Sequence, residues 1–264
     1  MEGVSEVGYV GRLRQFSRNA RLYLLHVIGM DLIHGAWEVL FNLYLLAVGF
    51  DVKFVGIRIA VLGIAGSLAS IPAGKLADRI DRKWGFIIGD GGGAVCALIL
   101  IMSTNANTIL AFSAVSACFS ALHHVTESPF MAENSEPDER IHLFSVEQGL
   151  ATLAAMVGAL IAGFLPQYLI ASEGLSLVEA YRWAVHIGIA WWFLSLIPAI
   201  MLKRHVSEEV AKARAEVVHD EHSGWFSALR NPKTVYRFVA IGTLLSLGGG
   251  FVLRLANVFF HYDL

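Results

Sequence analysis

Seven apolar stretches, each of about twenty residues or more, constrain the fold of this chain more than any other feature. They cover residues 22–48, 54–76, 84–102, 108–128, 143–170, 181–202 and 235–260. A helix needs about 20 mainly apolar residues to cross the hydrocarbon core of a bilayer. Backbone polar groups inside that core must be satisfied within the span, which favours helices. The sequence therefore predicts an all-α, polytopic membrane protein with seven transmembrane helices.

The low charge content supports a membrane environment. Only 16% of the 264 residues are charged and 56% are hydrophobic, whereas soluble domains average about 25% charged residues. The formal net charge is −2, so no basic excess points to nucleic acid. We therefore expect the lipid bilayer to surround the protein and expect no nucleic-acid partner.

Lysine and arginine are distributed unevenly among the connectors. If the N-terminus is cytoplasmic, sixteen of the twenty basic residues fall on the cytoplasmic side, in residues 1–21, 75–83, 129–142 and 203–237. Cytoplasmic connectors of membrane proteins carry such an excess of Lys and Arg. This bias predicts a cytoplasmic N-terminus, with the end of the seventh span on the opposite side.

The connector between the second and third spans holds the most specific motif. Residues 74–83 read G-K-L-A-D-R-I-D-R-K. Gly74 lacks a side chain, so a neighbouring helix can approach it closely, and Asp78 is placed to cap the free N–H groups of the next helix. Basic residues here can meet anionic lipid headgroups, each contributing about 1 kcal/mol. The motif residues that carry these features are Gly74, Asp78, Arg79, Arg82 and Lys83.

This motif resembles the signature of the major facilitator superfamily, G-x-L-A-D-R-x-G-R-K/R. It departs from the signature at Asp81, where the family has glycine and where we expect a left-handed turn that Asp tolerates. The resemblance implies a six-helix N-terminal bundle over residues 1–202, a cytoplasmic linker over 203–234, and one helix of a second bundle over 235–264. It also implies a gating role for the motif residues Gly74, Asp78, Arg79, Arg82 and Lys83, and a multi-pass protein of a bacterial inner or plasma membrane. Because the rest of a C-terminal bundle is missing, we interpret the chain as truncated.

Ionisable residues interrupt two of the apolar spans at helical spacing, and such residues usually face a cavity or a partner. In the first span, Asp31, Glu38 and Asn42 fall on nearly one line, with His34 beside it. The fourth span carries a second stripe that ends at Glu127. In the superfamily, helices one and four line the central cavity, so the resemblance implies that both stripes face the path of the substrate. The predicted path residues are Asp31, His34, Glu38, Asn42, Ser120, His123, His124 and Glu127.

The resemblance implies a secondary active transporter of a small solute rather than an enzyme. Carboxylates beside imidazoles can relay protons, so we predict proton coupling through Asp31, Glu38 and Glu127. We predict no catalytic residue, no cofactor and no metal. Asp90 and Glu147 are expected to pair with the basic residues of the motif connector.

Two other classes of protein fit the sequence less well. An intramembrane metal-dependent hydrolase needs about three protein ligands and an open position on its zinc ion. The candidate ligands for such a site are Asp31, His34, His123 and His124, and they lack a His-x-x-x-His pair on one helix face. The other class is a membrane sensor or scaffold that keeps the transporter fold without transporting.

Overall fold

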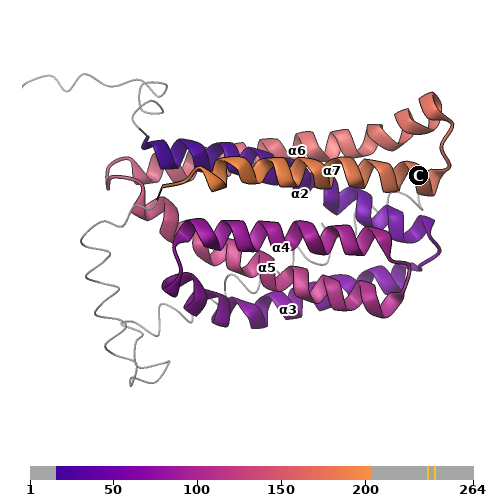
Figure 1. Ribbon diagram of the computed structural model, residues 1–264, viewed down its shortest axis with the longest axis horizontal. Coiled ribbons are helices and arrows are strands. Elements are labelled where there is room, and N and C mark those ends of the chain that lie inside the picture. Colours follow the sequence, from indigo (N-terminus) through magenta and orange to yellow (C-terminus); the bar gives the residue numbers. More distant parts are fainter. Residues whose placement is uncertain (1–15, 204–236, 238–240, 242–264) are drawn as a thin grey trace, which may run out of the picture. The chain divides into compact units, whose positions relative to one another are not determined.

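The computed structural model describes residues 16–203 together with 237 and 241. Six helices run along a common axis in this part of the chain (Figure 1), within one compact unit, Met1–His205. They are α2 (Arg18–Ala47), α3 (Val52–Arg79), α4 (Arg82–Met102), α5 (Ala106–Glu133), α6 (Arg140–Glu173) and α7 (Leu177–Ile200). The described residues contain no strand, which confirms the predicted all-α fold.

Each of the six helices is long and apolar enough to cross a membrane. Their ends lie within a few residues of the predicted spans, and the helices generally extend beyond them. The longest, α6, begins at Arg140 and ends at Glu173, a few residues outside the predicted span 143–170. The predicted linker and the predicted seventh span lie outside the described residues, apart from Lys203, Arg237 and Ile241.

Large hydrophobic side chains cover the outward faces of the helices. Leu68 on α3 and Leu160 and Phe164 on α6 are each more than half exposed. Soluble monomers rarely expose wide apolar surfaces, whereas lipid chains cover such surfaces in a bilayer. These faces therefore support the assignment of the six helices as membrane spans.

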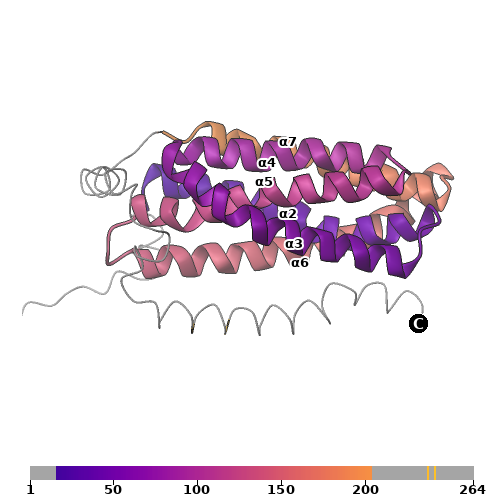
Figure 2. The same ribbon diagram turned by 90° about the horizontal axis from the view of Figure 1, so that it is seen from below.

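The helices pack as two groups of three. Helix α2 lies against α6 and α7, α5 lies against α3 and α4, and contacts between α4 and α7 join the groups. Figures 1 and 2 show this arrangement from two sides. The contacts of α2 correspond to those of α5 when the first three helices are exchanged, in order, with the last three, although α6 packs against α7 more closely than α3 does against α4. Internal structural repeats of three helices produce this symmetry.

Glycines allow α2 and α6 to approach each other closely. An added Cβ on Gly35 of α2 would overlap the backbone of Ala155, and one on Gly158 of α6 would overlap the backbone of Leu32. Membrane helices often use such small residues where their backbones touch. The crossing fixes the rotation of the α2 segment that carries Asp31.

Hydrogen bonds at one end of the unit tie the start of α2 to the ends of α5 and α7. The Ser17 hydroxyl donates to the carbonyl oxygen of Asn134 at 2.9 Å. The side-chain amide of Asn19 donates to Asn134 Oδ1 at 2.9 Å and to the carbonyl oxygen of Lys203 at 2.8 Å. Helix α2 is therefore held both at its first turn and at its crossing with α6.

Candidate functional site

Three predicted path residues lie on a partly open face of α2. The side chains of His34 and Glu38 are 51% and 37% exposed, and His34 Nε2 lies 4.0 Å from Glu38 Oε1 on the next turn. Asp31, one turn earlier, is half-buried. An open row of ionisable groups thus runs along α2 from Asp31 to Glu38.

Asn42 lies beyond this row and is buried. Its Oδ1 accepts a hydrogen bond from Arg58 Nη1 at 3.0 Å, and its Nδ2 donates to the carbonyl oxygen of Glu38 at 3.3 Å. The Arg58 guanidinium also lies 4.5 Å from the centre of the Phe41 ring, within the range of a cation–π interaction. In the described bundle Asn42 therefore links α2 to α3.

The predicted path residues on α5 do not all face the same side of the helix. Ser120 and His124 are exposed and Glu127 is partly exposed, with His124 Nδ1 lying 3.6 Å from Glu127 Oε2. His123, although adjacent to His124, is directed inward toward α4. The sequence did not distinguish these two histidines, because both fit the helical spacing within one residue.

His123 belongs to a buried cluster that also contains His26 of α2 and Asp90 of α4. His26 Nε2 lies 2.8 Å from Asp90 Oδ2, and the two side chains are 0% and 3% exposed. His123 Nδ1 lies 2.8 Å from Asp90 Oδ1. The other ring nitrogen of His26, Nδ1, lies 2.7 Å from the carbonyl oxygen of Ser195 on α7 and donates a hydrogen bond to it. Four helices therefore meet at this cluster.

Aromatic rings enclose the cluster. The Phe86 ring lies 5.8 Å from the ring of His26 and 5.3 Å from that of His123, measured between centroids. Tyr23 packs on Phe86 at 5.0 Å, and its buried hydroxyl has no hydrogen-bond partner among the described residues. Because such surroundings have a low dielectric constant, electrostatic interactions inside them are strong.

One further carboxyl group, that of Glu147, lies between the buried cluster and the open faces. Glu147 of α6 is buried, and its side chain interacts with that of Glu127 on α5. Asp31 and His123 lie within electrostatic range of Glu147. A continuous set of ionisable groups therefore extends from the interior of the bundle to the partly open sides of α2 and α5.

Metal-ligand chemistry is available at two overlapping sets of side chains. His26, Asp90 and His123 place their ligand atoms within 4.8 Å of one another, and so do His123, His124 and Glu127. Imidazole nitrogens and carboxylate oxygens are the usual ligands of divalent transition metals. His123 belongs to both sets.

The buried contact between His26 and Asp90 was not predicted from the sequence. His26 was not singled out, and the prediction that Asp90 pairs with the basic motif connector is wrong. Asp90 lies two turns inside α4, where its carboxylate faces α2 and α5 rather than the connector. An ionisable residue inside an apolar span is a signal for both positions. Their pairing was not readable, because the two residues are 64 positions apart in sequence.

The motif connector forms a tight turn between α3 and α4. Asp81, with φ −65° and ψ 140°, is the N-cap of α4 and accepts a hydrogen bond from the backbone N–H of Lys83 at 3.0 Å. The predictions that Asp78 caps this helix and that Asp81 is left-handed are both wrong. Asp78 lies in the last turn of α3, where its Oδ1 is 3.6 Å from Arg82 Nη1. The residue that departs from the family signature is therefore the one that caps the helix.

Arg82 holds the same turn together from the inside. Its Nε and Nη2 donate to Glu133 Oε1 at 3.1 Å and 3.0 Å, and its Nη1 donates to the carbonyl oxygen of Ala77 at 2.8 Å. Arg79 is exposed. An added Cβ on Gly74 would meet no described atom within 4 Å, so the described bundle contains no close helix approach at Gly74.

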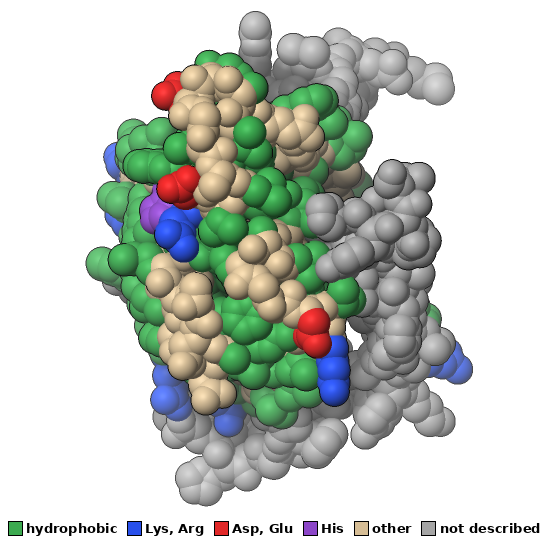
Figure 3. All heavy atoms as spheres, turned by 90° about the vertical axis from the view of Figure 1, so that its right-hand side faces the viewer, with side chains coloured by type: hydrophobic (Ala, Val, Ile, Leu, Met, Phe, Trp, Pro, Cys, Tyr) green, Lys and Arg blue, Asp and Glu red, His purple; other side chains and the backbone are tan. Residues whose placement is uncertain are grey.

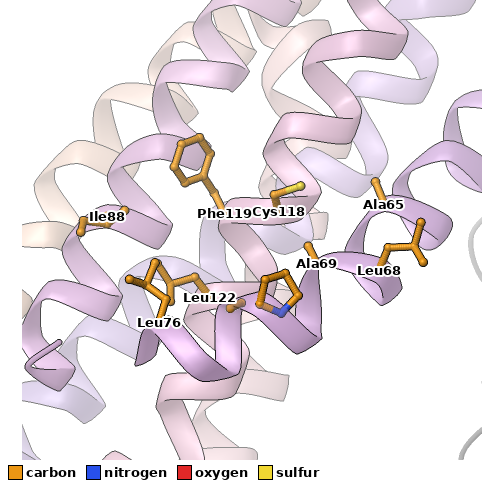
Figure 4. Close-up of a pocket in the computed structure, with 10 residues that line it drawn as sticks. Ala65, Leu68, Ala69, Leu76, Ile88, Cys118, Phe119 and Leu122 are labelled. Carbon is orange, nitrogen blue, oxygen red and sulfur yellow. The ribbon is translucent and has the colours of Figure 1, made fainter. Parts of the chain in front are cut away.

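An apolar recess of about 590 Å³ lies between α3, α4 and α5, away from the ionisable cluster (Figure 4). Its walls are mostly aliphatic and include Leu68 and Leu76 of α3 and Phe119 of α5. None of its lining residues, all within the described part of the chain, has a carboxylate, imidazole or basic side chain. The recess therefore offers apolar contact and no ionisable group.

The fold and the cluster together define a polytopic helical membrane protein with ionisable groups in its interior, a combination that marks solute or ion pathways. The family model of the Major Facilitator Superfamily matches residues 23–263. The chain belongs to the major facilitator superfamily, whose members are membrane transporters and not enzymes. No curated protein matches the chain.

Proposed function

We propose that this protein is a proton-coupled secondary active transporter of a small solute, with a path along the open faces of α2 and α5. The observation that carries the proposal is the row of Asp31, His34 and Glu38 on one partly open face of a membrane-spanning helix. Charged groups in a membrane span are costly unless they face a water-filled cavity or a partner. A solute path supplies the water and the partner.

Asp31, Glu38 and Glu127 are the proposed proton carriers. All three carboxyl groups are partly exposed, so a proton can reach them from a hydrated path. Imidazoles lie near two of them, His34 near Glu38 and His124 near Glu127. Histidine exchanges protons near neutral pH, which suits a relay along these faces. Ser120 completes the proposed set on the open face of α5. His123, which is directed toward α4, and Asn42, which is buried against α3, are proposed to support the path from the interior.

We further propose that the N-terminus is cytoplasmic and that the protein lies in a bacterial inner membrane. The start of α2, the α3–α4 turn and the α5–α6 connector lie at the same end of the bundle (Figure 1). This end carries the basic motif connector. Figure 3 faces the opposite end, where the few charged side chains are scattered among hydrophobic and neutral ones. The difference agrees with the excess of basic residues expected on the cytoplasmic side.

The proposed organisation has three segments: a six-helix bundle over residues 1–202, a cytoplasmic linker over 203–234 and a further transmembrane helix over 235–264. The motif connector is proposed to gate the path. Arg82 is its internal anchor through Glu133 and the carbonyl oxygen of Ala77.

Proton flux measured in proteoliposomes tests the function. Purified protein is reconstituted with a pH-sensitive dye inside the vesicles, and a panel of sugars, amino acids, organic ions and drugs is added outside. We expect at least one solute to cause proton movement. Glu38→Gln and Asp31→Asn should abolish that movement, while Glu136→Gln, a change in the exposed α5–α6 connector, should leave it intact. Solute uptake that is equally fast and equally proton-linked in all three variants would overturn the proposal.

A further inference from the structure

We propose that His26, Asp90 and His123 bind one divalent transition-metal ion of the zinc class. The inference does not depend on proton-coupled transport, and it differs from the sequence-based prediction of no metal. The sequence offered no metal motif because the three ligands come from three helices, α2, α4 and α5. Their ligand atoms lie within 4.8 Å of one another.

A proton or a metal ion must lie between His26 Nε2 and Asp90 Oδ2. A carbonyl oxygen only accepts hydrogen bonds, so the contact between His26 Nδ1 and the Ser195 carbonyl oxygen at 2.7 Å requires hydrogen on Nδ1. A neutral imidazole then has a lone pair on Nε2. That lone pair faces an oxygen of Asp90 at 2.8 Å, and two lone pairs repel unless a proton or a metal ion lies between them.

A metal ion, unlike a proton, can also bind the lone pair of His123 Nδ1. His123 Nδ1 lies 2.8 Å from the other oxygen of Asp90, yet among the described residues this buried nitrogen has no hydrogen bond of good alignment. A single proton serves only the pair formed by His26 and Asp90. A metal ion accepts lone pairs from both imidazoles and from the carboxylate at once, and the three ligand atoms, which lie within 4.8 Å of one another, are close enough to share one ion.

The ligand set selects the class of metal. Two imidazoles and one carboxylate suit zinc and neighbouring transition metals, whereas Mg²⁺ and Ca²⁺ prefer oxygen ligands. Zinc bonds to nitrogen and oxygen are about 2.0–2.2 Å long, which fits ligand atoms that already lie close together. A metal-binding histidine usually donates its other N–H to a carbonyl or carboxylate, and His26 does so to Ser195.

Charge in the surroundings favours a divalent ion. One ionised carboxylate and two neutral imidazoles leave a surplus positive charge when a divalent ion binds. Glu127 and Asp31 lie within electrostatic range of His123, and Glu147 interacts with Glu127. These acidic groups can offset the surplus in the low-dielectric interior. The ion would thereby join α2, α4 and α5 at one point.

Zinc binding to the purified full chain tests the proposal. The background protein carries His219→Ala and His222→Ala, which remove a closely spaced histidine pair outside the described residues. It is stripped with a chelator, dialysed against buffered Zn²⁺, and assayed for bound metal by mass spectrometry. We expect one zinc ion per chain and no competition from Mg²⁺ or Ca²⁺.

Single variants then locate the ion. Asp90→Asn and His123→Ala should each weaken zinc binding by at least about 100-fold. Even the loss of a residue that only hydrogen-bonds to a metal ligand costs about 10–100-fold. His186→Ala is the matched control, since His186 is an accessible histidine of α7 that contacts the carbonyl oxygen of Arg182. This control should bind zinc like the background protein.

Cobalt adds a readout that does not require every variant to fold. Bound Co²⁺ should give visible absorption bands typical of nitrogen and oxygen ligands in the background protein, and His123→Gln should shift them. Absence of stoichiometric zinc from the background protein would show that the cluster holds a proton only and would overturn the proposal. Undiminished binding in both Asp90→Asn and His123→Ala would overturn it too.

Discussion

Two histidines of α2 are each paired with a carboxylate, in opposite settings: His26 with Asp90 of α4, and His34 with Glu38 of α2 itself. His26 and Asp90 are almost completely buried, with 2.8 Å between Nε2 and Oδ2. His34 and Glu38, roughly two turns further along α2, are both partly exposed and 4.0 Å apart. The two carboxylates differ by one methylene group. The larger difference is in the setting, because the first pair joins two helices in the interior and the second lies along one partly open helix face.

The comparison shows how burial assigns a role to an ionisable group in a membrane bundle. A buried charge must be compensated by fixed groups of the protein, and removing one partner leaves the other uncompensated. A partly exposed charge can instead be compensated by water or by a passing solute. The buried pair therefore holds helices together, whereas the open pair is in contact with the surroundings of the bundle.

The largest expected effect comes from breaking the buried pair. Asp90→Asn should lower the free energy of unfolding by about 3 kcal/mol or more, because it removes the carboxylate that contacts both imidazoles of the cluster, and breaking a buried pair costs about 3–5 kcal/mol. Glu38→Gln should lower it by less than about 0.5 kcal/mol, as for other partly exposed sites. Unfolding is followed by SDS titration in mixed micelles, with a chelator present so that bound metal does not contribute. Equal destabilisation by the two variants would remove the basis of the comparison.

A smaller effect is expected where backbone contact positions the open segment of α2. Gly158→Ala adds a Cβ that overlaps the backbone of Leu32, so it should lower the free energy of unfolding by about 1–3 kcal/mol. Gly163 lies on the same helix, and a Cβ added there would meet no described atom within 4 Å. Gly163→Ala should therefore be neutral or stabilising by up to about 1 kcal/mol.

The same SDS titration measures both glycine variants. If Gly163→Ala destabilises the protein as much as Gly158→Ala, helix contact at Gly158 is not what positions α2. Uptake measurements add a functional readout, because a shift of α2 at Leu32 also moves the neighbouring Asp31. We expect Gly158→Ala to slow solute-dependent proton movement more than Gly163→Ala does.

Much of the fold was predictable because the bilayer imposes a simple length rule. Six described helices match predicted spans to within a few residues, since a continuous apolar run has few alternatives in hydrocarbon. Local turn geometry was harder to predict. Asp81 caps α4 in place of Asp78, because α3 continues through Asp78 to Arg79 before the chain turns.

The site was predictable in part, for a different physical reason. Helical spacing placed Asp31, His34 and Glu38 on one face, since neighbours on a helix are fixed by its pitch. Contacts between helices follow no such rule. The joining of His26 to Asp90 and of Asn42 to Arg58 depends on how the helices rotate against one another, and one sequence does not reveal that rotation.

The smallest expected effect concerns the open pair itself. His34→Ala should change the free energy of unfolding by less than about 0.5 kcal/mol, because exposed ion pairs one turn apart on a helix contribute about 0.3–0.5 kcal/mol. His26→Ala, measured in the same SDS titration, is the matched buried change and should cost several times more. In the proton-flux assay His34→Ala should slow proton movement although the bundle stays intact, because it removes an imidazole from the proposed relay. A His34→Ala protein that is strongly destabilised would show that the open segment of α2 is also held by charge, and the distinction between the two pairs would fail.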